Sequence, residues 1–288
     1  MKRRIIGLIL LVTAFLCLSA CVNLSAKQSR DSSFSIQFID VGQGDSALIE
    51  CDGHYMLIDG GDKSAGKNVY DVLESKGIQK LDYLVISHLH SDHIGGLIKA
   101  LSYASSIGKT LANTDSPSIE SGLFNDLVHQ LAINGSKITV PHVGDKFKLG
   151  SSEIEVIDVS SQDPNDSLVI LVTYGKTRFL FTGDIGDSAQ TRISDKFQND
   201  SDAFFSITLM KLPHHGSYSG TLYRFLRTFM PEYVVISVGK DNQYGHPHHE
   251  TLDLLNSKTW SPKVYRTYLN GNIVVRSDGK KLSVETEK

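Results

Sequence analysis

The chain has little cysteine, a single tryptophan and almost no net charge. Its three cysteines are Cys17, Cys21 and Cys51, and the first two lie in an apolar N-terminal segment. The rest of the chain therefore holds one cysteine, which excludes a disulfide bond within it. The formal net charge of the 288 residues is −3, so binding of nucleic acid would need a local basic patch. Neither Trp260 nor the tyrosines show the spacing of a base-stacking platform.

The N-terminal segment is typical of a targeting signal. Three basic residues precede an almost continuously apolar run over residues 5–18, which is short for a membrane span. The residues Leu-Ser-Ala directly precede Cys21, as in bacterial lipoprotein signals, in which cleavage leaves a lipid-bearing cysteine. An ordinary cleaved signal and an uncleaved anchor are the alternatives. We expect a lipoprotein signal peptide over residues 1–21, lipidation of Cys21, a flexible polar tether over 22–33, and attachment to the extracytoplasmic face of the cell membrane.

The remainder, residues 34–288, is expected to form one domain because no linker-like stretch interrupts it. Apolar runs predict strands in two groups, the first between residues 35 and 87 and the second between residues 153 and 237. Short strands are also expected near 137–140 and 146–149, and two closing strands near 264–266 and 272–276. Amphipathic segments that predict helices follow the strands of each group. Two strand-rich halves with helices outside both predict an α/β fold, a sandwich of four layers in the order helix, sheet, sheet, helix.

The densest polar cluster in the sequence is His88-Leu-His90-Ser-Asp92-His93. An apolar strand-type run precedes it, and Gly95-Gly96 follows within a helix expected over residues 94–105. Buried histidines and aspartates each need a partner, so crowding four of them is costly unless something binds them all. One or two divalent metal ions would meet that need, and a polar loop with incidental histidines is the alternative.

Three further loops that follow predicted strands carry aspartate or histidine, and they contain Asp184, His214-His215 and His246. Loops at strand ends meet at one edge of a sheet, so these side chains can assemble with the 88–93 cluster. A carboxylate from a separate strand, such as Asp184, can bridge two metals. Mixed nitrogen and oxygen ligands suit Zn²⁺, Mn²⁺ or Fe²⁺, and the absence of cysteine ligands argues against a structural zinc site. We predict one or two divalent ions, Zn²⁺ or Mn²⁺, that activate a water molecule.

The His88-x-His90-x-Asp92-His93 motif resembles the signature of the metallo-β-lactamase fold superfamily. Further motifs occur in the order seen in the extracellular hydrolase domain of ComEC competence proteins, namely Asp40-Val-Gly-Gln-Gly-Asp45-Ser46, Asn165-x-Ser167, Thr182-Gly-Asp184, Pro213-His-His-Gly-Ser217 and Gly245-His-Pro247. The resemblance covers residues 34–284 and implies the four-layer αββα sandwich of that superfamily.

The resemblance also implies roles for individual residues. The metal ligands would be His88, His90, Asp92, His93 and Asp184, together with either His214 or His215, between which the sequence does not decide. Asp59 would support the metal loop from behind the ligands. Catalytic roles fall to Asp92, Asp184 and His246, and the residues expected around the ligands or the substrate are Asp40, Gln43, Asp45, Asp59, Asn165 and Ser217.

One ligand of the family pattern is missing. Many members carry another histidine between the first motif and the Gly-Asp motif. Here only His129 and His142 lie in that interval, neither in a suitable Gly-rich loop, and Asn165-Asp166-Ser167 occupies the corresponding place. The first metal is therefore expected to have a weaker or open coordination position, filled by Asn165, Asp166, water or substrate.

Three polar features allow more than one interpretation. The turn before Asp45 either orients the metal loop or is only a tight turn. The segment 216–219 either cradles a phosphate at a helix start or provides an N-cap through Ser219 or Gly220. His246 could bind substrate, donate a proton or supply a metal ligand.

Together these features favour an extracytoplasmic, metal-dependent hydrolase. The resemblance implies a phosphodiesterase or DNA nuclease, with a phosphodiester substrate such as DNA; the lipid would provide contact with the membrane, and no protein partner is indicated. The alternatives are a phosphorylcholine esterase-like enzyme, a lactam or ester hydrolase, and a degenerate metal-binding surface protein. The missing histidine disfavours the lactam hydrolase, and the nearly complete ligand set disfavours the non-enzyme. Basic residues that could line a substrate groove are Lys211, Arg224, Arg227, Lys240 and Arg266.

Overall fold

The computed structural model describes residues 33–114, 121–159, 167–198, 206–258 and 260–288, and residues 33–288 form one compact unit. The expected signal peptide, the lipidation site Cys21, the tether and Asn165 lie outside the described residues, so what was expected of them stays a prediction. Within the described ranges, no helix is long and apolar enough to cross a membrane.

The chain forms two sheets. The first has eight strands in the spatial order β15 (Leu282–Thr286), β14 (Ile273–Ser277), β1 (Phe34–Phe38), β2 (Ala47–Cys51), β3 (His54–Ile58), β4 (Lys80–Ile86), β5 (Ser106–Ala112) and β6 (Ile138–Thr139). The second has seven strands in the order β13 (Lys263–Arg266), β12 (Tyr233–Ile236), β11 (Leu209–Lys211), β10 (Thr177–Phe181), β9 (Val169–Tyr174), β8 (Ser152–Asp158) and β7 (Lys146–Leu149).

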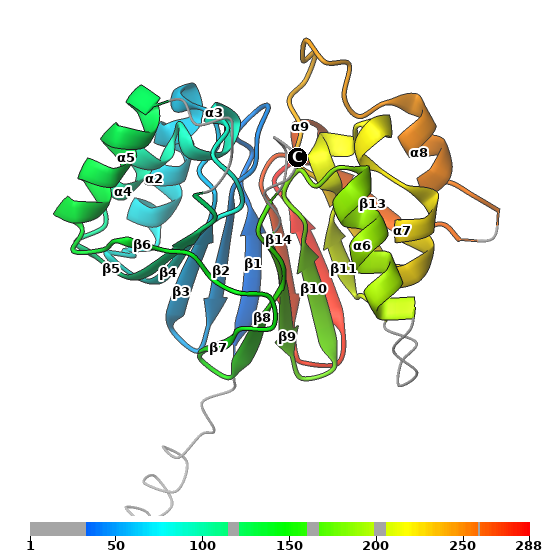
Figure 1. The fold of residues 1–288 in the computed structure, drawn as a ribbon, viewed down its shortest axis with the longest axis horizontal. Coiled ribbons are helices and arrows are strands. Elements are labelled where there is room, and N and C mark those ends of the chain that lie inside the picture. Colours follow the sequence, from blue (N-terminus) through cyan, green and yellow to red (C-terminus); the bar gives the residue numbers. More distant parts are fainter. Residues whose placement is uncertain (1–32, 115–120, 160–166, 199–205, 259) are drawn as a thin grey trace, which may run out of the picture. The chain divides into compact units, whose positions relative to one another are not determined.

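Helices cover the outer face of each sheet (Figure 1). The first sheet is covered by α2 (Gly66–Ser75), α3 (Ser91–Ile94), α4 (Leu97–Leu101) and α5 (Ser121–Ile133), and the second by α6 (Asp187–Gln198), α7 (Tyr223–Phe229) and α8 (His249–Leu255). The short elements η1 (Lys63–Ala65), η2 (Pro213–Gly216), η3 (Tyr218–Gly220) and α9 (Thr267–Asn270) connect strands to these helices or to one another. The predicted four-layer α/β sandwich is therefore confirmed.

A continuous apolar core joins the two sheets. The alternation along β1 turns Phe34, Ile36 and Phe38 toward the second sheet. The ring of Phe34 stacks on those of Tyr174 and Phe179, with both centroid distances 4.9 Å. Burial of each such side chain contributes roughly 1.5–3 kcal/mol relative to exposure. The halves that the sequence separates are therefore held against each other, and loops from both can share one site.

Parallel pairing places the polar loops of each sheet at one edge. Strands β3, β4, β5 and β6 run parallel in the first sheet, and β10, β11, β12 and β13 run parallel in the second. The carboxyl ends of parallel strands open toward the same side, which is where α/β proteins place their ligands. Asp59 follows β3, and the 88–93 cluster follows β4. Asp184 follows β10, the pair His214-His215 follows β11, and His246 lies in the segment after β12.

The single helix expected over residues 94–105 was wrong. The chain instead forms α3 and α4, separated at Gly95-Gly96, and then enters β5 at Ser106. Close packing requires glycine at this point: a Cβ on Gly96 would overlap the carbonyl oxygen of Gly60. Because glycine has no Cβ, the end of the metal loop can lie directly on the turn that follows β3.

Candidate metal centre

Asp59 holds the metal loop from beneath. It follows β3 in a left-handed conformation, with φ 55°, and is buried. Its carboxylate accepts hydrogen bonds from the backbone N–H of Ser87 at 2.8 Å and from the Ser87 hydroxyl at 2.6 Å. It also lies 2.9 Å from Nδ1 of His93, which donates to it. A carboxylate at Nδ1 directs Nε2 of the same ring toward a metal, the arrangement expected of a residue that supports a ligand.

Asp45 supports the opposite side of the loop. Its backbone N–H donates to the carbonyl of Asp92 at 3.2 Å, and a Cβ on the preceding Gly44 would overlap that same carbonyl. Its carboxylate pairs with Lys211 and lies 3.4 Å from Nδ1 of His215. The Gly-rich turn is therefore more than a tight turn, because it brings a buried carboxylate against both the metal loop and His215.

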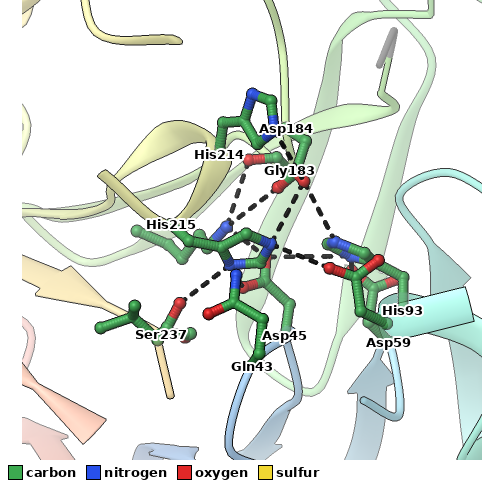
Figure 2. A network of polar contacts seen from close by, with 12 residues as sticks. Gln43, Asp45, Asp59, His93, Gly183, Asp184, His214, His215 and Ser237 are labelled. Atoms are coloured by element: carbon green, nitrogen blue, oxygen red, sulfur yellow. Dashed lines mark hydrogen bonds and ion pairs between the residues drawn. The ribbon is translucent and has the colours of Figure 1, made fainter. Parts of the chain in front are cut away.

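Asp184 is the centre of the cluster (Figure 2). It follows β10, and its backbone N–H donates to the Ser167 hydroxyl at 2.9 Å. Its Oδ2 atom faces the Nε2 atoms of four imidazoles: His215 at 3.3 Å, His93 at 3.4 Å, His88 at 3.8 Å and His214 at 4.0 Å. These rings follow strands of both sheets, so the Asp184 carboxylate lies between imidazoles from the two halves of the chain.

The structure distinguishes the two histidines that the sequence left undecided. His214 and His215 both adopt left-handed conformations, with φ 47° and 53°, which non-glycine residues rarely adopt. This turn points His215 inward, where Nδ1 donates to the Ser237 carbonyl at 2.9 Å and Nε2 lies 3.2 Å from Asp92. His215 is buried, whereas about a quarter of the His214 side chain is exposed. The inner position at the cluster is therefore that of His215.

The donor atoms fit divalent metal ions. One ligand atom from each of Asp92, His93, Asp184 and His215 lies within 4.8 Å of all the others. Three buried atoms have no hydrogen-bond partner among the described residues: Nε2 of His93, Nε2 of His215 and Oδ1 of Asp184. Buried polar atoms normally have partners, so this set is complete only with a ligand that the protein does not supply.

A second, smaller group of donors lies beside the first. Nε2 of His88 and Nδ1 of His90 are 3.0 Å apart, and His88 also faces the Asp184 carboxylate. Neither ring belongs to the four-residue group within 4.8 Å. Both groups include Asp184. This arrangement would suit two metal ions, of which the one at His88 and His90 would have fewer protein ligands than the one at the four-residue group.

Burial and opposite charges perturb the pKa values of several residues of the cluster. Burial alone would lower the pKa of His93 and of His215, but the Asp184 carboxylate and its neighbours raise both well above the usual value. Burial alone would raise the pKa of Asp184, but the imidazoles of His215 and His93 lower it well below the usual value. His88 and His214 differ from these two rings, because burial lowers the pKa of both, and the nearby His93 adds to the effect at His88. A metal ion would take the place of the protons on His93 and His215.

Lys211 belongs to the site, although the sequence suggested it only as a residue that could line a groove. Lys211 is 3% exposed, and its ammonium group pairs with the Asp45 carboxylate. Its Nζ atom lies 3.6 Å from Oδ1 of Asp184 and donates a hydrogen bond to the Gly183 carbonyl at 3.2 Å. Burial alone would lower its pKa, but the Asp45 carboxylate raises it, so the ammonium stays charged. Its presence inside an otherwise apolar strand was the signal that could have revealed this role.

The remaining predicted residues lie at different distances from the centre. The ring of His246 is 6.3 Å from that of His215 and 5.6 Å from that of His214. The Gln43 side chain points into the cluster (Figure 2), with Oε1 accepting from the Gly239 N–H at 3.2 Å. Asp40 is directed elsewhere, since its carboxylate accepts from the Gly42 N–H at 3.3 Å and from Lys288 at 3.4 Å.

Two of the backbone donors of the phosphate cradle expected at residues 216–219 are engaged within the protein. The N–H of Ser217 donates to the His214 carbonyl at 2.8 Å, and the N–H of Tyr218 donates to Nδ1 of His248 at 3.1 Å. The expected N-cap was wrong, because α7 begins after Leu222 without a side-chain cap. The Ser217 hydroxyl is buried and lies 3.1 Å from that of Ser219.

The sequence over residues 39–240 matches the profile of the metallo-beta-lactamase superfamily, which is more than half of the chain. The chain belongs to the metallo-beta-lactamase superfamily. Members of this superfamily are generally hydrolases that use divalent metal ions, and the cluster around Asp184 offers the ligands for them.

Within the metallo-beta-lactamase superfamily, the chain is similar to competence proteins. It is 27% identical over 294 residues to ComE operon protein 3 of Bacillus subtilis, covering 93% of this chain and 36% of that protein. It is 28% identical over 269 residues to competence protein ComA of Neisseria gonorrhoeae, covering 92% of this chain and 35% of that protein. The chain therefore spans about a third of the length of the curated relatives it matches.

Solved structures of other metallo-beta-lactamase fold proteins share the architecture. The YhfI protein of Bacillus subtilis superimposes with a TM-score of 0.56 at 12% identity, covering 85% of this chain and 100% of that one. CmlA, a diiron β-hydroxylase from Streptomyces venezuelae, superimposes with a TM-score of 0.51 at 14% identity, covering 82% of this chain and 53% of that one. At such identities, the likeness shows the fold alone.

Proposed function

We propose that this metallo-beta-lactamase superfamily member is a metal-dependent phosphodiesterase that cleaves DNA or another phosphodiester polymer outside the cytoplasm. Zn²⁺ or Mn²⁺ would be the ion, and a lipid on Cys21 would hold the chain at the membrane. The observation that carries the hydrolase assignment is the Asp184 carboxylate set among four imidazoles, with buried ligand atoms that the protein leaves without hydrogen-bond partners. The phosphodiester assignment is supported by the likeness to competence proteins.

A divalent metal pair supplies a water of lowered pKa and positive charge for the phosphoryl oxygens. The chain holds the ligands for it in fixed orientations. Asp59 orients His93, and the Ser237 carbonyl orients His215, so that both Nε2 atoms face Asp184. This preorganisation removes the need to rearrange ligands during the reaction.

His246 contributes a neutral imidazole beside the centre. Burial, with the nearby His215 and His214, lowers its pKa to about 4. At neutral pH the ring is therefore unprotonated, and it suits a role in accepting a hydrogen bond or a proton from substrate or water. A role as an imidazolium that protonates the leaving group is disfavoured.

Three substrates test this proposal with the same metal-loaded protein: single-stranded DNA, bis(p-nitrophenyl) phosphate and the lactam nitrocefin. We expect cleavage of the two phosphodiesters with Zn²⁺ or Mn²⁺.

Asp184→Ala should lower the rate by about 100-fold or more, since loss of even a residue that supports a ligand costs roughly 10–100-fold. His142→Ala removes an exposed histidine paired only with Asp145 and should leave the rate unchanged. Nitrocefin turnover without phosphodiester cleavage would overturn the proposal.

A further inference from the structure

A row of aromatic side chains extends from the metal centre to the protein surface. The ring of His246 contacts those of His214, His248 and Tyr244, with centroid distances of 5.6, 4.7 and 5.6 Å. The ring of Tyr218 lies 5.0 Å from that of His248. The row therefore begins beside Asp184 and ends at two tyrosines, Tyr218 at the start of η3 and Tyr244 in the loop between β12 and α8.

The two tyrosine rings are open to solvent. Tyr218 is 61% exposed and Tyr244 is 55% exposed. The ring of Tyr244 lies nearly parallel to that of His246, at 24°, and stacks on it, so the outer face of Tyr244 ends the row at the surface.

Hydrogen bonds fix the loops that carry these rings. The side-chain oxygen of Asn242 accepts from the N–H groups of Tyr244 and His246, at 3.1 and 3.0 Å, and its Nδ2 donates to the Gly239 carbonyl at 2.9 Å. The N–H of Tyr218 donates to His248, whose own N–H donates to the Gly216 carbonyl at 3.0 Å. The backbone that carries both rings is therefore held by hydrogen bonds before any substrate arrives, which reduces the entropy lost on binding.

We propose that Tyr218 and Tyr244 form a stacking subsite for the nucleobases that flank the scissile phosphodiester of a single-stranded nucleic acid. The inference rests on the proposed phosphodiesterase function and names its substrate class. Flat exposed rings accept any base, because every base has a π-face, whereas the bases of a duplex are already stacked on one another. A cage for a quaternary ammonium group would instead need several rings around one point. The two exposed rings here pack on different imidazoles, Tyr218 on His248 and Tyr244 on His246.

The test compares an oligothymidylate with an abasic oligonucleotide of the same length, which keeps the phosphodiesters and lacks the bases. Binding is followed by fluorescence anisotropy and cleavage by KM, in the full metal-loaded chain. Tyr244→Ala and Tyr218→Ala are each expected to weaken binding of the oligothymidylate by about tenfold and to leave the abasic strand unaffected. Tyr244→Phe and Tyr218→Phe keep the ring and should bind as the parent does. Tyr223→Ala is the matched control, since Tyr223 is 50% exposed and has no part in the ring row.

Each outcome separates the subsite from the proposed function. Equal binding of the two strands, with no effect of the tyrosine variants, overturns the subsite even if both strands are cleaved. Selective binding without any cleavage supports the subsite and contradicts the phosphodiesterase. Tyrosine variants that lose hydrolysis of p-nitrophenyl phosphorylcholine, with oligothymidylate binding unchanged, would assign the rings to a head group and overturn the inference.

Discussion

Lys211 and Asp45 form a buried ion pair beneath the metal centre. Lys211→Met leaves the Asp45 carboxylate buried without its cation, which we expect to reduce the free energy of unfolding by about 3–5 kcal/mol. The measurement is urea unfolding in the presence of a chelator, so that metal binding does not contribute. A second change, Asp45→Asn, removes the uncompensated charge and should recover part of the loss.

An exposed pair provides the control. Lys67 and Asp71 form an ion pair on α2, and most of the Lys67 side chain is exposed. Lys67→Met should change the stability by less than about 1 kcal/mol. If Lys211→Met costs no more than this control, Lys211 does not hold the Asp45 carboxylate in the way described.

His93 and His215 make metal binding dependent on pH. The carboxylates around them raise both pKa values well above the usual value, so without metal both rings carry protons at neutral pH. Metal must displace these protons, and its affinity should therefore fall as the pH falls. With two protons displaced, the Kd for Zn²⁺ should rise by about 100-fold for each unit of pH lowered. Calorimetry in buffers of different ionisation enthalpy counts the protons, and a count of zero would contradict the assignment of both rings as ligands.

At the scale of elements, the contact between Gly60 and Gly96 sets the position of the metal loop. A Cβ at Gly96 would overlap the Gly60 carbonyl, so Gly96→Ala should destabilise the fold by about 1–3 kcal/mol and weaken metal binding. Gly122→Ala is the control, because no atom of the described residues lies within 4 Å of an added Cβ there and alanine favours its helix, α5. Thermal unfolding and metal titration of both variants measure the difference. Equal effects of the two changes would mean that the glycine contact does not fix the loop.

The strands that lead into the site could be predicted from the sequence, because each is a short apolar run with turn residues on both sides. The elements that the sequence did not predict lack that pattern. β5 contains Gly108 and the exposed Lys109, and β15 is an edge strand whose residues are mostly exposed. Such strands form because neighbouring strands supply hydrogen bonds along the sheet, β4 and β6 for β5 and β14 for β15, and not because their own residues show a strand pattern.

The ligand types could be predicted because His and Asp crowd into loops after strands. The choice of His215 over His214 could not, since it depends on two consecutive left-handed residues that no local pattern indicates. Lys211 was missed for a similar reason. Its partners Asp45 and Asp184 come from distant parts of the chain, and only the fold brings their carboxylates to its ammonium group.

At the scale of the whole molecule, attachment to the membrane is proposed through Cys21. Cys21→Ser should abolish incorporation of labelled palmitate, whereas Cys17→Ser, a change in the same apolar segment, should leave it intact. The mass of the mature N-terminal peptide gives an independent readout. A mature chain that begins after another residue would indicate an ordinary signal, and an intact residue 1 would indicate an uncleaved anchor.

The two sheets together build one centre, since the ligands on the 88–93 loop and those around Asp184 come from opposite halves of the chain. The most direct test titrates Zn²⁺ or Mn²⁺ into chelator-stripped protein and follows bound metal and hydrolysis of bis(p-nitrophenyl) phosphate in the same sample. We predict no hydrolysis without metal, a rate that rises with the metal bound, and loss of both in Asp184→Ala. Hydrolysis that persists in the stripped protein, or that Asp184→Ala leaves unchanged, would contradict the account.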